Sequence, residues 1–126
     1  MLIDSNIIIY AAQDEHQAIR DFIAKHSPSV SAVSYIEVLG YHKLTQEARH
    51  YYEDFFAAAR ILPITNDVIE QAIRLRQSRR MTLGDALIAG TALVNNLMLV
   101  TRNTEDFDWI EGLQLLNPFG SENDAV

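Results

Sequence analysis

Residues 1–12 of the chain read MLIDSNIIIYAA. The first four residues are mostly apolar, and they predict a short buried strand that ends at Asp4. The run Asp4-Ser5-Asn6 consists of good helix-capping residues, so the apolar stretch from Ile7 to Ala12 is predicted to be a helix, although its periodicity alone also allows a strand. An apolar strand followed directly by a helix is typical of an α/β fold.

The same alternation continues along the chain. Further strands are predicted at residues 30–33, 61–64, 97–101 and 113–116. The helices between them are predicted from their caps and apolar faces. The first has Ile19, Phe22 and Ile23 on its inner face and stops near Ser27-Pro28, and the second begins at Ser34. The other three are a helix with the apolar face Ala48, Tyr52, Phe55 and Phe56, a helix capped by Asn66 that buries Val68, Ile69, Ala72 and Ile73, and a helix from Leu83 to Val94 that Thr82 starts. The fold class predicted is a three-layer α/β/α sandwich with a mainly parallel central sheet. Residues 1–119 are predicted to form one domain, and residues 120–126 a polar C-terminal tail.

Composition narrows the functional classes. The 126 residues are 48% hydrophobic and 21% charged, which is typical of one globular domain. The absence of cysteine excludes disulfides, thiolate zinc sites and cysteine nucleophiles. Without a basic leader or an apolar run near the ~20 residues of a membrane span, the sequence predicts a soluble cytoplasmic protein. The net charge of −7 argues against a nucleic-acid substrate, because phosphate binding usually favours a basic surface. However, a site in which acidic side chains surround a cation can be locally neutral.

Several kinds of active site are missing from the sequence. Its five glycines form neither a dinucleotide fingerprint nor a phosphate-binding loop, and no serine lies in a Gly-x-Ser-x-Gly elbow. The four histidines lack metal-ligand spacing and are predicted to be solvated; they are His16, His26, His42 and His50. Acidic residues in apolar surroundings are the remaining candidates.

Four acids stand at positions where a parallel sheet and its helices begin or end: Asp4, Glu37, Asp85 and Asp106. Each has an ordinary explanation, since three of them suit helix caps or first turns and the fourth suits a turn. Ser34 and Glu37, for example, have the spacing of a capping box. In a parallel sheet, however, strand ends and the starts of the following helices share one edge, so the four carboxylates are expected to converge there. They would repel one another unless some were protonated or a cation bound them, and oxygen ligands alone favour Mg²⁺ or Mn²⁺ and phosphodiester chemistry.

Four segments, taken in order, resemble the PIN-domain ribonucleases of the VapC-like toxin group, which belong to type II toxin–antitoxin pairs. The resemblance covers the chain from Met1 to about Phe119. Its segments are Leu2-Ile3-Asp4-Ser5-Asn6, Ser34-Tyr35-Ile36-Glu37, Gly84-Asp85-Ala86-Leu87-Ile88-Ala89 and Val100-Thr101-Arg102-Asn103-Thr104-Glu105-Asp106-Phe107.

The resemblance implies a metal-dependent endoribonuclease with Mg²⁺ or Mn²⁺ as cofactor. It assigns Asp4, Glu37 and Asp85 to the metal, and Asp106 takes the fourth acidic position because Asn103 is neutral. Asn103 is left as a possible ligand through its amide oxygen or as a residue that orients water. Together with Asn103, the supporting residues implied are Ser5 and Asn6, which are expected to hydrogen-bond the first acid.

The resemblance also implies an RNA substrate, a homodimer and a cognate antitoxin. The C-terminal segment of the antitoxin is expected to lie across the active-site groove, against an exposed part of the helices within residues 41–56.

Two other functions are compatible with parts of the sequence. A haloacid dehalogenase-type phosphatase needs a second acid where Asn6 stands and a suitable lysine, and the only lysines are Lys25 and Lys43. A catalytically inactive PIN-like scaffold that binds RNA or protein is the alternative, and the neutral Asn103 supports it.

Positive charge is clustered near the acidic motifs. Arg79, Arg80 and Arg102 are predicted to contact RNA phosphates, whereas Arg74 and Arg76 are predicted to be solvated. The aromatic group Tyr51, Tyr52, Phe55 and Phe56 is predicted to be core or partner surface, and Trp109 to be a packing residue near the last strand.

Overall fold

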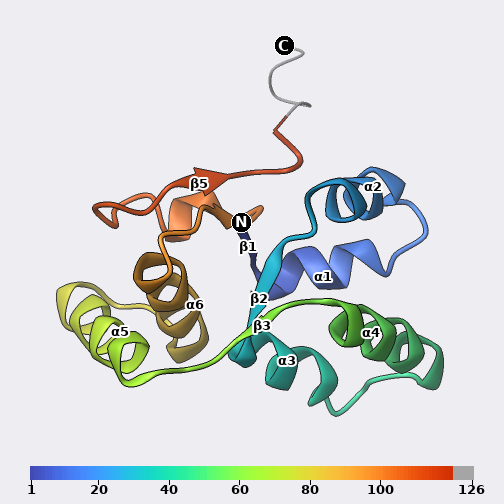
Figure 1. Ribbon diagram of the computed structural model, residues 1–126, viewed down its shortest axis with the longest axis horizontal. Helices are drawn as coiled ribbons and strands as arrows, with labels where there is room; N and C mark the ends of the chain where they lie inside the picture. Colours follow the sequence, from blue (N-terminus) through green and yellow to red (C-terminus); the bar gives the residue numbers. More distant parts are fainter. Residues whose placement is uncertain (121–126) are drawn as a thin grey trace.

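The computed structural model of the chain describes residues 1–120, so the predicted tail beyond Gly120 lies outside the described residues. The elements follow the predicted alternation of strands and helices (Figure 1). In order they are β1 (Leu2–Ile3), α1 (Ser5–Ala11), α2 (Gln17–His26), β2 (Ser29–Ser31), α3 (Ala32–Leu39), α4 (Gln46–Ala58), β3 (Ile61–Leu62), α5 (Asn66–Ser78), α6 (Leu83–Val94), β4 (Leu99–Val100), the 3₁₀ helix η1 (Thr104–Asp106) and β5 (Leu115–Leu116).

The five strands form one parallel sheet in the order β3-β2-β1-β4-β5. Every predicted strand is present, but each is only two or three residues long. Hydrogen bonding continues past the strand ends, since the Asp4 amide donates to Val100 O at 2.9 Å and the Thr101 amide to Leu116 O at 3.0 Å. Asp4 and Thr101 are thereby held at the carboxyl ends of two adjacent strands, the central β1 and its neighbour β4.

Two apolar cores lie on opposite faces of the sheet, as the alternation of side chains along a strand requires. Ile3 and Val100 belong to the core that α1, α2, α3 and α4 cover. Leu2 and Leu99 belong to the core beneath α5, α6 and the residues after η1. The predicted three-layer α/β/α sandwich with a parallel sheet is therefore confirmed (Figure 1).

Two predicted helix starts are wrong. Helix α3 begins at Ala32, because the Ser31 hydroxyl accepts a hydrogen bond from the Val33 amide at 3.1 Å, so Ser34 lies inside the helix. Helix α5 is capped by Thr65 rather than Asn66. The predicted cap of α6 is confirmed, since Thr82 Oγ1 accepts from the Asp85 amide at 3.1 Å.

The buried face of α5 also differs from the prediction. Val68, Ala72 and Leu75 are buried, while Ile69 and Ile73 are 42% and 51% exposed. The buried residues are spaced i, i+4, i+7 and form one helical stripe, and the two isoleucines lie one residue further around the helix. Gly90 of α6 allows close approach here, because a Cβ on it would lie 3.1 Å from Val68 O. The tight α5–α6 contact therefore selects which half of a wide apolar surface is buried.

Of the aromatic group on α4, Tyr52 and Phe56 are buried in the core, and Tyr51 and Phe55 are partly buried against it. Trp109 packs partly buried against the other core, as predicted. None of the helices within residues 1–120 combines the length and apolar character that a membrane crossing would need.

Candidate active site

The carboxyl edge of the sheet carries a point where the strand order reverses. β1 is continued on one side by β2 and β3, and on the other by β4 and β5. Open parallel sheets form their ligand sites at such a point, just outside the strand ends. Asp4 follows β1 there, and Thr101 follows β4.

Asp4 is a buried carboxylate, with 5% of its surface exposed. Its Oδ2 accepts a hydrogen bond from the Thr101 hydroxyl at 2.9 Å. Although Asp4 occupies the N-cap position of α1, its side chain makes no capping hydrogen bond. The ordinary explanation for an acid at this position therefore does not account for it.

The surroundings raise the pKa of Asp4 from its usual 3.8 to about 6. Burial is the largest cause, and the negative charges of Asp85 and Glu37 raise the pKa of Asp4 further. The Thr101 hydroxyl and the Ser5 backbone amide act in the opposite direction. An ionised Asp4 is thus costly in the protein alone and would be stabilised by a nearby cation.

Glu37 extends from α3 toward the start of α6 and is held by two serines. Ser5 Oγ lies 2.8 Å from Glu37 Oε1 and 2.8 Å from Ser34 Oγ. Since a carboxylate only accepts and Ser5 has one hydroxyl hydrogen, the Ser5 hydroxyl donates to Glu37 and accepts from Ser34. The predicted capping box between Ser34 and Glu37 is wrong, because both lie within the helix that Ser31 caps.

Gly84 provides the space for the Glu37 carboxylate. A Cβ on Gly84 would lie 2.6 Å from Glu37 Oε2, so a larger residue would displace that oxygen. Gly84 directly precedes Asp85 in the first turn of α6. The Glu37 carboxylate is therefore packed against the helix start that carries the next acid.

Asp85 and Asp106 complete the acidic group. Asp85 is partly buried, and its pKa is raised first by burial, then by the charges of Asp106 and Glu37, against the Thr82 side chain, which lowers it. Asp106 is exposed at the end of η1. The charges of Asp85 and Glu37 thus act on Asp4, and the charges of Asp106 and Glu37 act on Asp85. The four carboxylates, which are far apart in the sequence, therefore lie near one another.

The donor set fits a hard divalent cation. Its atoms are carboxylate oxygens, without histidine or cysteine, and such ligands suit Mg²⁺ or Mn²⁺. No group of three or more Asp, Glu or His side chains within residues 1–120 is already arranged to hold an ion. Glu37 and Asp106 are the exposed members, so rotation of their side chains would be needed to close a site around the buried Asp4.

The supporting residues differ from those expected. The Ser5 hydroxyl bonds Glu37 rather than Asp4, while the exposed Asn6 and Asn103 side chains make no hydrogen bond to the acids in the described part of the chain. Thr101 is the partner of Asp4 that sequence reasoning did not identify. Only its place at a strand end pointed to it, because the two residues are 97 positions apart.

A cavity of about 660 Å³ adjoins the acids. Arg79 and Arg80 line it together with Asp85 and Asp106, so two of the three arginines assigned to RNA lie beside the acidic group. Arg76, which was expected to be only solvated, lines the cavity as well.

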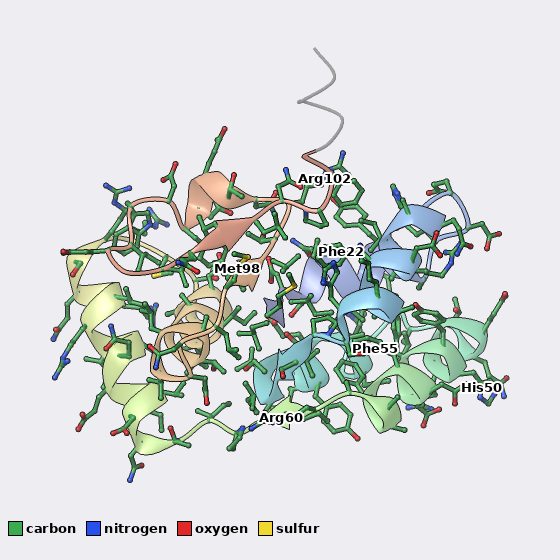
Figure 2. The ribbon with its side chains drawn as sticks, turned by 45° about the horizontal axis from the view of Figure 1, so that its top comes forward. Phe22, His50, Phe55, Arg60, Met98 and Arg102 are labelled. Atoms are coloured by element: carbon green, nitrogen blue, oxygen red, sulfur yellow. The ribbon has the colours of Figure 1, made fainter. Side chains whose placement is uncertain are left out.

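Arg102 has different neighbours from those of the other two arginines. Its guanidinium carbon lies 4.2 Å from the ring centroid of Phe119 and 5.1 Å from that of Tyr10. It lies close to the last described residues of the chain (Figure 2).

Three of the four histidines are exposed, and His50 lies at the outer side of α4 (Figure 2). The fourth, His16, is partly buried and packs edge-on against Tyr10 and Phe119.

Comparison with known proteins agrees with this architecture. A family model described as "PIN domain" matches residues 1–113. A toxin–antitoxin complex from Klebsiella pneumoniae contains a chain with 28% identity and a TM-score of 0.75; the match covers 93% of this chain and 96% of that one. VapBC2 from Rickettsia felis, bound to a promoter DNA fragment, is 21% identical over 92% of this chain and 96% of that one, with a TM-score of 0.80. DNA-bound VapBC from Salmonella typhimurium is 18% identical over 93% and 96% of the two chains, also with a TM-score of 0.80. No curated protein matches the chain in sequence.

Proposed function

Since this chain belongs to the PIN domain family, we propose that it is a metal-dependent endoribonuclease and the toxin of a toxin–antitoxin pair. PIN domains are generally nucleases, which supports a hydrolase that acts on nucleic acid. The single observation that carries the metal-dependent part of the proposal is Asp4. It is a buried carboxylate without a capping role, its pKa is raised, and two further acids act on it.

The roles follow from the contacts. Asp4, Glu37, Asp85 and Asp106 would hold the cation, which supplies a water of lowered pKa and stabilises charge on the phosphate. Thr101 holds the Asp4 carboxylate at the strand end, and the Ser34–Ser5 pair orients Glu37. These neutral hydroxyl donors position the carboxylates without cancelling the negative charge that attracts a cation.

The test is cleavage of RNA by the purified chain in Mn²⁺ or Mg²⁺. Asp4→Asn and Asp85→Asn are expected to fold and to lose metal-dependent cleavage. Asp54→Asn, at an exposed position on α4, is the matched control and should cleave normally. A single-stranded DNA of the same sequence tests the RNA preference. Full activity of Asp4→Asn would contradict the proposal.

The alternative is a PIN-like scaffold that binds RNA or protein without cutting, which the neutral Asn103 and the open arrangement of the acids favour. Metal binding separates the two functions. An ion held by the acids should raise the melting temperature by mass action, in wild type more than in Asp4→Asn. A scaffold without a metal site should show the same small response in both.

For the antitoxin, we propose a groove of about 400 Å³ that includes Ile9, Tyr41, Leu44 and Tyr52 and reaches Glu37. Ile9 and Tyr41 are 40% and 54% exposed, so a peptide could bury both while its end approaches the acids. The similar structures from K. pneumoniae and R. felis are toxin–antitoxin or VapBC complexes, which supports such a partner. Tyr41→Asp should lose a co-purifying small protein but keep RNA cleavage; retention of that protein would argue against the groove.

For the homodimer, we propose the apolar surface of three adjacent helices. Ile36 of α3, Ile69 and Ile73 of α5, and Leu83 of α6 are between 42% and 68% exposed. Helices α3 and α5 both contact α6, and a patch of large exposed aliphatic side chains is typical of protein–protein contacts.

A further inference from the structure

The cavity beside Asp85 and Asp106 combines both signs of charge with an aromatic ring. Besides these two acids, its lining includes Arg79, Arg80 and Trp109. Its volume of about 660 Å³ lies within the range of small-ligand sites, roughly 300–1,000 Å³. A nucleic acid whose phosphate would bind a cation held by Asp85 therefore has space here for an adjacent nucleotide.

Trp109 lines this cavity and brings a large flat apolar ring to it. Its indole Nε1–H donates to Asp106 O at 2.9 Å, which satisfies the polar edge of the ring and ties its orientation to the acidic segment. The ring is partly buried against the core, so its position is also held by packing. A ring whose only donor is already used recognises ligands by stacking rather than by hydrogen bonding.

Arg79 extends this surface. Its guanidinium carbon lies 4.9 Å from the centroid of the Trp109 ring, and the residue is exposed at the end of α5. Both indole rings and guanidinium planes stack on nucleobases, and the exposed Arg79 side chain is free to make room for one. Arg79 and Arg80 also bring positive charge for a phosphate in a chain of net charge −7.

We propose that this cavity is a nucleobase subsite, in which a base next to the scissile phosphate stacks on Trp109 and Arg79. The position of the base next to a cleaved phosphate rests on the proposed nuclease function, whereas the binding of a base in this cavity is a separate property. The site would bind an unpaired base by its face. It would therefore favour single-stranded segments and tolerate more than one base type.

Fluorescence gives a direct test, because Trp109 is the only tryptophan in the chain. In EDTA, so that RNA stays intact, the full chain is titrated with a mixed-sequence single-stranded 12-mer RNA. The same titration is made with an abasic ribose-phosphate oligomer of equal length. RNA should quench the Trp109 emission strongly and saturably, and the abasic oligomer should leave the emission nearly unchanged.

Two variants give a second readout on the metal-loaded chain. Trp109→Leu keeps an apolar side chain but removes the stacking face, and Trp109→Phe keeps a smaller one. Base–aromatic stacking corresponds to roughly a 5- to 150-fold change in binding. We expect KM for RNA to rise within that range in Trp109→Leu, and Trp109→Phe to recover most of the loss. Circular dichroism melts of both variants confirm that they fold.

The outcomes separate this inference from the proposed function. Metal-dependent cleavage without base-dependent quenching, or with an unchanged KM in Trp109→Leu, overturns the subsite alone. Base-dependent quenching in a chain that cuts no RNA supports the subsite and refutes the nuclease function. Equal quenching by RNA and the abasic oligomer, or none by either, overturns the subsite in every case.

Discussion

Replacement of Asp4 by Asn is expected to stabilise the metal-free protein at neutral pH. The pKa of Asp4 is about 6 in the fold and 3.8 as the ordinary value. Each unit of difference between these two pKa values corresponds to about 1.4 kcal/mol, so keeping Asp4 ionised lowers the free energy of unfolding by about 3 kcal/mol at pH 7.5. Asn removes this cost and its Oδ1 can still accept from Thr101. The buried amide N–H groups of Asn would lack a hydrogen-bond acceptor, and this desolvation cost reduces the gain in stability by about 1 kcal/mol.

The net gain expected is about 2 kcal/mol, or a rise in melting temperature of about 5–10 °C. The sign of the pH dependence follows from the raised pKa. Between pH 3.8 and 6 the folded chain holds a proton on Asp4 that the unfolded chain has lost, so wild-type stability falls as pH rises through this window. The electrostatic cost at pH 5 is therefore about half of its value at pH 7.5, and the advantage of Asp4→Asn shrinks accordingly.

Urea unfolding in EDTA at pH 5.0 and 7.5, at low protein concentration because the pI is near 4.9, measures both effects. Asp54→Asn, exposed on α4, is the control and should change stability by less than about 0.5 kcal/mol. In Mn²⁺ the wild type should recover more stability than Asp4→Asn, because the cation would bind only the charged set well. If Asp4→Asn were less stable than wild type at pH 7.5, or if its advantage were equal at both pH values, the argument from burial and repulsion would be refuted.

Three further predictions concern other parts of the molecule. Gly84→Ala should fold with unchanged or higher stability but cleave RNA at least about tenfold more slowly, because its Cβ would displace the Glu37 carboxylate; wild-type cleavage rates would show that this placement is unimportant. If the proposed homodimer forms through the apolar surface of α3, α5 and α6, Ile73→Glu should shift the chain from dimer to monomer in sedimentation experiments, while the exposed position limits the loss of monomer stability to about 0.5 kcal/mol; a wild-type dimer that Ile73→Glu leaves intact would contradict this interface. Arg80→Gln should lower the slope of log binding constant against log salt by about 0.7 to 0.9, whereas Arg74→Gln, which does not line the cavity, should not; equal slopes in both variants would remove Arg80 from the phosphate contacts.

Sequence patterns located the elements well because their causes are local. Apolar runs marked β1, β3, β4 and β5, and the alternation of small polar and apolar residues at 30–33 marked β2. Thr82 marked the start of α6 through its own hydroxyl. The start of α3 was misplaced because Ser31 and Ser34 are both able to cap a helix. Ser31 is the residue that leaves the sheet, where it is paired with Leu62, and that pairing is not visible in the local sequence.

The exposed face of α5 illustrates the same limit. Helical periodicity shows a wide apolar surface that includes both Val68 and Ile69, but it does not show which half meets another helix. Contact with Gly90 of α6 decides that Val68 is buried and leaves Ile69 exposed.

The sequence by itself determined that this chain forms an α/β fold, with acids at a strand end and at helix positions near one edge, because hydrophobic periodicity and capping depend on near neighbours. Tertiary structure alone decided which groups act on those acids. Thr101 reaches Asp4 because β4 lies beside β1, and Ser5 reaches Glu37 because α1 packs on α3. Such contacts join residues that are tens of positions apart, and strand order and helix packing, which no local pattern encodes, bring them together.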